Sequence, residues 1–207
     1  MHTCPSHTKQ RRTVMTEPAI KKEPTVINDV NVSQLGETVE AIQQDPDIAK
    51  FEFRARNRWL GGGHNRSTIQ SFYGACEEDT TRTAPFVLDA DEPPLLLGTD
   101  RGANPVEYVL HALAACVTTS TVYHAAAQGI EIEAVESSLE GDLDLQGFLG
   151  LKEDVRRGFQ QIRINFRVKG DASEEQLRAL SQMSPVLDIV TNPVPVQIHI
   201  ERESRSR

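Results

Sequence analysis

The residue of this chain best suited to chemistry is a cysteine inside a long apolar segment. Cys116 follows Ala114 and Ala115, whose small side chains leave room around the sulfur. A thiol reacts as its thiolate, and a nearby cation lowers its pKa. Without such a cation, a free cysteine in an apolar helix behaves as a small hydrophobic core residue. Both interpretations of Cys116 stay open at this point.

The other chemistry-bearing residues form no recognisable motif. Cys4 and Cys76 are too scattered for a disulfide framework or a zinc site, and no set of histidines and carboxylates has metal-ligand spacing. We therefore expect no metal and no other cofactor. His124, eight residues after Cys116, would lie about 80° from it around a helix. It is a candidate for lining a cleft beside the thiol, with hydrogen-bonded packing as the alternative.

Composition excludes several classes of protein. The chain has 207 residues and 38% hydrophobic content, which suits one domain with a core and excludes disorder throughout. Its formal net charge of −8 argues against binding nucleic acid. No apolar run approaches the roughly 20 residues of a membrane helix, and the chain start lacks the apolar stretch of a secretory signal. Because the cysteines are few, we expect a protein of the reducing cytoplasm.

The N-terminal part divides into a tail and an extension. Residues 1–28 are basic and lack apolar periodicity, which predicts a disordered tail. Residues 29–50 are predicted to be a helical extension, with an amphipathic helix over 33–47 that stops near Asp45-Pro46. The main domain is expected over residues 51–201.

Several segments alternate apolar and polar side chains, as half-buried strands do. These are residues 51–59, 66–73, 131–145, 162–168 and 194–200, with a short strand over 86–88. The glycines 61–63 make the first two segments a hairpin. Two short helices are predicted to open at Ser173 and Ser184. Hairpins with few helices between strands indicate an α+β fold with mainly antiparallel sheets.

The helix that carries Cys116 has the clearest boundaries in the sequence. Asn104 suits the N-cap, Pro105 the first helical position and Glu107 a capping box, whereas Gly129 suits the stop. The resulting helix is about 37 Å long. Because its residues are apolar or small nearly all round, we expect it to be covered by a sheet or by a second subunit.

Two motifs resemble the OsmC/Ohr family, the osmotically inducible and organic-hydroperoxide-resistance proteins. They are NPVEYVLHALAAC at 104–116 and SPVLDIVTNPVPVQIHIE at 184–201, and the resemblance extends over about residues 50–201. It implies an OsmC-like fold in which antiparallel sheets wrap two long helices of an intertwined homodimer. Active members are thiol peroxidases, in which a thiolate is oxidised to sulfenic acid by a hydroperoxide. A second cysteine then forms a disulfide, and an external dithiol restores both.

Carried over by residue, the resemblance matches Cys116 to the peroxide-attacking cysteine. Ser184 stands where resolving members have the second cysteine, so an internal disulfide cannot form there. Val106 occupies the family's glutamate position. Glu107, one residue later, would point away from Cys116, about 180° around the helix. N-terminal capping is therefore the alternative role for Glu107.

The arginine that the resemblance requires beside the thiol has two main candidates. Arg66 begins the second strand of the hairpin, and Arg101 directly precedes the long helix. The leading hypothesis is a one-cysteine thiol peroxidase, which would reduce organic hydroperoxides through Cys116 and need an external thiol reductant. One alternative is a non-catalytic dimer whose cleft binds an apolar or thiol-reactive small molecule. The other is a structural protein in which Cys116 is core packing.

Overall fold

A computed structural model describes residues 23–204, so most of the tail predicted over 1–28 lies outside the described part. The last residues of that predicted tail are ordered, because β1 (Val26–Ile27) pairs antiparallel with β2 (Val30–Asn31). The predicted helix of the extension is confirmed as α1 (Val32–Gln44). It ends at Asp45, because Pro46 has no N–H to continue it and instead opens the 3-10 turn η1 (Pro46–Ala49).

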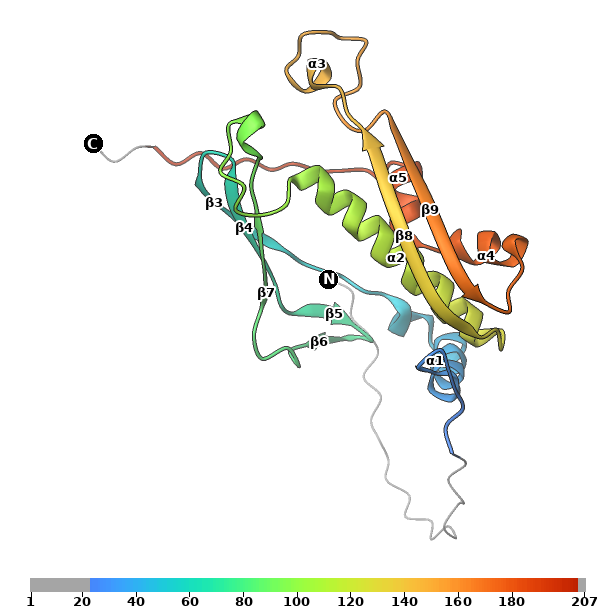
Figure 1. Ribbon diagram of the computed structural model, residues 1–207. Coiled ribbons are helices and arrows are strands. Elements are labelled where there is room, and N and C mark those ends of the chain that lie inside the picture. The colour runs from blue at the N-terminus through green and yellow to red at the C-terminus, as the bar shows by residue number, and fades with distance from the viewer. Residues whose placement is uncertain (1–22, 205–207) are drawn as a thin grey trace.

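The hairpin around the three glycines is confirmed as β3 (Arg56–Gly61) and β4 (His64–Ile69). With β7 (Phe86–Ala90) these strands form a three-stranded antiparallel sheet in the order β3-β4-β7. We refer to it as the N-terminal sheet (Figure 1).

The strand predicted over 66–73 is interrupted. It continues as a separate small hairpin, β5 (Phe72–Gly74) with β6 (Glu77–Asp79). At the break, Gln70 Nε2 donates to Arg82 O at 3.1 Å, and Arg82 Nη1 donates to Gln70 O at 3.0 Å. Side chains thus replace part of the sheet hydrogen bonding there. Of the strand predicted over 51–59, the first part makes only an isolated bridge between Glu52 and Tyr73.

The long helix is confirmed as α2 (Pro105–Ala127), with Asn104 as its N-cap and Gln128 as its C-cap. One stripe of it is buried, listed along the helix as Leu113, Val117, Thr121, Ala125 and Ala126. The opposite face is open to solvent in this chain, where Ala112, Thr119 and Tyr123 are exposed. The expectation that α2 is covered by other parts of the protein therefore holds for only one of its faces within the described residues.

The covered face of α2 lies against the C-terminal half of the chain (Figure 1). There β8 (Ile132–Asp142) and β9 (Gln161–Gly170) form a long antiparallel hairpin, as the alternation predicted. Helices α4 (Glu174–Ser181) and α5 (Pro185–Thr191) follow it, both near their predicted bounds. Between β8 and β9 a lobe carries the one-turn helix α3 (Leu145–Phe148). All paired strands are antiparallel, so the structure has the expected α+β class.

The predicted last strand over 194–200 is wrong for this chain. Residues 193–204 have no regular secondary structure, and the four alternating apolar side chains are exposed, up to 86% for Ile200. Alternation predicts a strand only where a neighbouring strand can accept its backbone hydrogen bonds. No strand within the described residues pairs with this segment.

Candidate functional site

Cys116 is a free thiol, half-buried near the middle of α2. On the helix it lies at the edge of the buried stripe. Leu113 is about 60° to one side of it and is fully buried, whereas Thr119 is about 60° to the other side and is exposed. The sulfur therefore sits where the core ends and the open face of α2 begins, a position that a core-packing cysteine does not require.

The thiol of Cys116 makes no hydrogen bond and no ion pair within residues 23–204. Residues 23–204 therefore supply no charged hydrogen bond that would favour the thiolate. What the arrangement offers chemically is a half-buried free thiol on a mostly apolar helix, without a hydrogen-bonded or ion-paired partner among the described residues.

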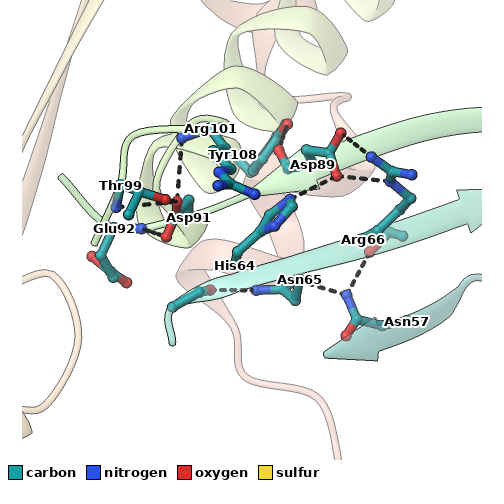
Figure 2. A network of polar contacts seen from close by, with 12 residues as sticks. Asn57, His64, Asn65, Arg66, Asp89, Asp91, Glu92, Thr99, Arg101 and Tyr108 are labelled. Carbon is teal, nitrogen blue, oxygen red and sulfur yellow. Dashed lines mark hydrogen bonds and ion pairs between the residues drawn. The ribbon is translucent and has the colours of Figure 1, made fainter. Parts of the chain in front are cut away.

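Arg66, one of the two arginine candidates, is engaged with a carboxylate on the neighbouring strand. Its Nε and Nη2 donate to the two oxygens of Asp89 at 2.8 and 3.0 Å, and His64 Nε2 lies 3.1 Å from the same carboxylate (Figure 2). The Arg66 guanidinium, followed by the His64 contact, holds the pKa of Asp89 below its usual range. The sheet register brings these side chains together, because Arg66 directly pairs with Asp89.

Arg101, the other candidate, ends a loop that is organised around a buried carboxylate. Asp91 accepts hydrogen bonds from the Thr99 hydroxyl at 2.7 Å and from the backbone N–H groups of Glu92, Thr99 and Arg101 (Figure 2). These donors, the Thr99 hydroxyl first, lower the pKa of Asp91 to about 2. The ionised Asp91 thus fixes the backbone that presents Arg101 to solvent.

Both arginines lie near the beginning of α2 rather than beside Cys116 of the same chain. The Tyr108 hydroxyl donates to Asp89 O at 2.6 Å, which ties the Arg66 pair to the first turn of the helix. Glu92, from the Arg101 loop, accepts a hydrogen bond from the Asn104 side chain at the cap. Tyr108 precedes Cys116 by eight residues, about 12 Å along the helix axis. The described chain therefore does not bring either candidate arginine to its own thiol.

Glu107 performs the capping role proposed as its alternative. Its carboxylate accepts from the Asn104 N–H at 2.8 Å, and the Asn104 side chain accepts from Val106 N–H at 2.9 Å. Val106 is half-buried and contributes an apolar side chain at the start of the helix. His124 is half-buried in the last turn of α2, two turns beyond Cys116. These three residues are thus spread along α2 rather than gathered at the thiol.

Ser184, at the position of the missing second cysteine, is almost completely buried, with 1% of its surface exposed. It is the N-cap of α5, and its Oγ accepts a hydrogen bond from Leu187 N–H at 3.2 Å. Helix α5 packs against α2. The hydroxyl therefore serves the helix end and satisfies its own hydrogen bonding, as a buried polar group must.

Sequence reasoning missed the carboxylates that organise the N-terminal end of α2. Neither Asp89 nor Asp91 was among the predicted site residues, and Asp89 directly follows the short strand predicted over 86–88. The Asp89 carboxylate is bonded to residues that lie 23 and 25 positions away, and Asp91 to loop residues up to 10 positions away. No local sequence pattern indicates these contacts. Within residues 23–204 there is no group of three or more side chains suited to a metal ion. None of the helices described has the length and apolar character to cross a membrane.

A family model described as OsmC-like protein matches residues 98–199, which contain α2, Cys116 and Ser184. A comparison with curated proteins finds no match. Among solved structures, similarity is found to an OsmC-like protein from Mycoplasma pneumoniae, with 17% identity over 69% of this chain and 89% of that chain, at a TM-score of 0.49. An organic hydroperoxide resistance protein OsmC from Legionella pneumophila shares 19% identity over 68% of this chain and 89% of that one, at a TM-score of 0.46.

The matched residues include the whole motif at 104–116 and the motif from Ser184 as far as residue 199. The segment from β3 to β7 lies before the matched range and contributes the N-terminal sheet. Through residues 98–199, the chain belongs to the OsmC-like family.

Proposed function

We propose that the protein is a one-cysteine thiol peroxidase that reduces organic hydroperoxides through Cys116. The observation that carries the proposal is the position of the free thiol at the boundary between the core and the open face of α2. A buried thiol could not meet a substrate, and a fully exposed one would lack apolar surroundings for an alkyl group. Membership of the OsmC-like family supports the same chemistry.

The proposed reaction has two stages. The Cys116 thiolate attacks the terminal, hydrogen-bearing oxygen of the hydroperoxide ROOH, the O–O bond breaks, and the alkoxide takes a proton to leave as ROH. The sulfur is then a sulfenic acid. A first external thiol condenses with it to a mixed disulfide and releases water. A second external thiol exchanges with that disulfide, which restores Cys116 and leaves the reductant oxidised as its own disulfide.

The need for an external reductant follows from Ser184. Its oxygen cannot form a disulfide, and the hydroxyl is already used in the cap of α5. The sulfenic acid at Cys116 would therefore persist until a small or protein thiol reaches it. Such thiols are abundant in the cytoplasm, and we propose that the protein acts there. Its role would be in the response to oxidative stress.

We further propose that the working form is a homodimer. The N-terminal sheet, the open face of α2 and the segment 194–200 all expose large apolar side chains, and surfaces of this size mark protein–protein contacts. A second copy laid on the open face of α2 would bring new arginines toward Cys116. Arg66 and Arg101 are the candidates for this role, each acting on the thiol of the other chain.

Peroxide-dependent oxidation tests the proposal. Purified protein is mixed with cumene hydroperoxide, and sulfenic acid on Cys116 is trapped and located by mass spectrometry. We expect oxidation far faster than that of a free cysteine and complete loss in Cys116→Ser. Arg66→Gln or Arg101→Gln should slow it, whereas Arg167→Gln, an exposed arginine on β9, should not. If Cys116 is oxidised no faster than free cysteine, the proposed peroxidase activity is wrong.

A second function, non-catalytic binding of a small molecule beside Cys116, is favoured by one observation. Cys116 has no hydrogen-bond partner in residues 23–204, and Val106 stands at the glutamate position, so the groups that would activate the thiol are not assembled in one chain. Native mass spectrometry of freshly purified protein separates the two functions. A retained ligand together with no peroxide consumption would favour binding over catalysis.

A further inference from the structure

The lobe between β8 and β9, residues 143–160, projects from the end of the hairpin, away from the body of the molecule (Figure 1). It is internally packed. Asp144 caps α3 by accepting from Gln146 N–H at 2.9 Å, and Gly147 lies so close to the Arg156 backbone that a Cβ there would be 2.4 Å from Arg156 O. The lobe therefore has a defined shape despite its projection.

This packed lobe turns apolar side chains outward. Phe148 is 70% exposed, Leu149 59% and Leu151 69%, and they lie within four residues of one another. Internal packing leaves no room for them, because the α3 turn meets the backbone of residues 155 and 156 through glycine. Contact with a hydrocarbon surface from outside the lobe would remove these three apolar side chains from water, which is favourable.

Basic side chains stand directly beside this apolar surface. An open cavity of about 610 Å³ in the lobe is lined by Val155, by the glycines at 147, 150 and 158, and by four charged residues, Lys152, Glu153, Arg156 and Arg157. The lining is thus net positive, in a chain whose formal charge is −8. No salt bridge within residues 23–204 involves any of the three basic side chains, whereas Arg54, Arg66 and Arg163 are all paired. Their charge is available to an anion.

We infer that the lobe is a binding site for an anionic amphiphile, a carboxylate or phosphate attached to a hydrocarbon chain. The anion would lie in the cavity against Lys152, Arg156 and Arg157, with the arginine N–H groups donating to its oxygens in the paired geometry that guanidinium favours. The hydrocarbon chain would cover Phe148, Leu149 and Leu151. This site is separate from the thiol and independent of the proposed peroxidase activity.

Charge and shape together select this occupant. An inorganic anion would leave the apolar side chains in water, and a neutral hydrocarbon would leave the cations unused. An anionic bilayer would meet the chain's overall negative charge over a wide area, which opposes its approach. A single amphiphile needs only the local charge of the lobe.

The experiment compares ligands that have the anionic group, the hydrocarbon chain, or both. Isothermal titration of the full-length protein is carried out with decanoate, 1-decanol and acetate, and co-sedimentation with phosphatidylglycerol vesicles. We expect decanoate to bind at least about tenfold more tightly than either 1-decanol or acetate, because each lacks one set of contacts. Equal binding of 1-decanol, equal binding of acetate, or binding to vesicles without binding to decanoate would each overturn the proposal.

Variants then place the ligand on the lobe. The double variants Arg156→Gln/Arg157→Gln and Phe148→Ser/Leu149→Ser should each weaken decanoate binding by at least about tenfold. The matched controls are Arg167→Gln and Leu95→Ser, the latter 91% exposed in a different loop, and both should leave binding unchanged. Equal losses in variants and controls would contradict the site. Circular dichroism on each variant shows that it is folded, and the ligand comparison on the unaltered protein stands without them.

Discussion

The two halves of the molecule differ in how much of their apolar surface is buried. The half built from α2, β8, β9, α4 and α5 contains the buried apolar residues, which are Leu113, Val117, Ala125, Ala126 and Leu180. The N-terminal sheet contains none, and it exposes Trp59 by 71% as well as Phe86 and Val87. It is held instead by polar contacts such as those between Arg66 and Asp89.

This difference shows which part of the chain can stand alone. Burial of apolar surface is the main favourable term in folding, so the C-terminal half has a source of stability that the N-terminal sheet lacks. A small sheet without a buried apolar face is marginal in water. The sheet therefore depends on its polar attachment to the start of α2 and, in our proposal, on a second copy of the chain. The predictions below compare these two sources of stability.

The largest effect is expected in the buried stripe of α2. Leu113→Ala removes a side chain that is 1% exposed, and we expect the free energy of unfolding to fall by about 2–5 kcal/mol, because the cavity cannot fully close. Urea denaturation followed by far-ultraviolet circular dichroism measures it. A loss below about 1 kcal/mol would mean that the core does not lie on this face of the helix.

A smaller effect is expected where the N-terminal sheet meets the loop before α2. A Cβ on Gly102 would lie 2.1 Å from Asp89 O, so Gly102→Ala must displace backbone. We expect a loss of about 1–3 kcal/mol in thermal or urea unfolding. Gly36→Ala in α1 is the matched control, since a Cβ there meets nothing within 4 Å. That control should be stabilising by about 0.5–1 kcal/mol; a similar loss in both variants would contradict the close approach at Gly102.

The cap of α2 should matter by a comparable or slightly smaller amount. Asn104→Ala removes the side chain that accepts from Val106 N–H, and we expect a cost of about 0.5–2 kcal/mol in the free energy of unfolding. Asn104→Asp retains the acceptor and should recover most of the loss. If Asp restores nothing, the Glu92 contact rather than the cap is what Asn104 supplies.

The loop around Asp91 should make the attachment sensitive to acid. The pKa of Asp91 is about 2 in the folded chain and higher when unfolded, so folding favours its ionised form. Its stabilising contribution is complete above pH about 4 and is lost as the pH falls toward about 2. Thermal unfolding of the wild type and Asp91→Asn should therefore differ at pH 6 and converge near pH 2. A difference that does not change with pH would show that Asp91 acts without its charge.

The smallest effect on the isolated chain is expected at Trp59. Because its side chain is exposed, Trp59→Ser should change the unfolding free energy of the monomer by less than about 0.5 kcal/mol. If a second copy covers the N-terminal sheet, the same variant weakens self-association at higher concentration. Sedimentation velocity over a dilution series measures this. An unchanged association would place the dimer contact elsewhere.

Local patterns were sufficient for most elements of the fold. The caps and prolines at Asn104-Pro105 and Ser184-Pro185 predicted helix starts that the structure has, because capping is satisfied within a few residues. The glycine turn predicted the β3-β4 hairpin for the same reason. The alternation at 194–200 failed, because a strand also needs a partner that local sequence does not specify.

The candidate site was less predictable than the elements that carry it. Cys116, Val106 and Glu107 were placed correctly on one helix, since helical geometry follows from residue number alone. The positions of Arg66 and Arg101 relative to that helix depend on Asp89 and Asp91, whose contacts cross from strand to helix and around a loop. Those contacts carry the arginines to the start of α2, and no spacing in the sequence indicates this.

What the sequence determined by itself is therefore the set of elements, the family and the thiol on the long helix, because each rests on interactions over a few residues or on a motif. Only the tertiary structure decided which face of α2 is buried and that Cys116 lies at its edge. It also decided that the arginines are held by carboxylates and that the lobe turns its apolar side chains outward. These outcomes depend on packing and charge pairing between distant segments, whose energies appear only when the chain has folded.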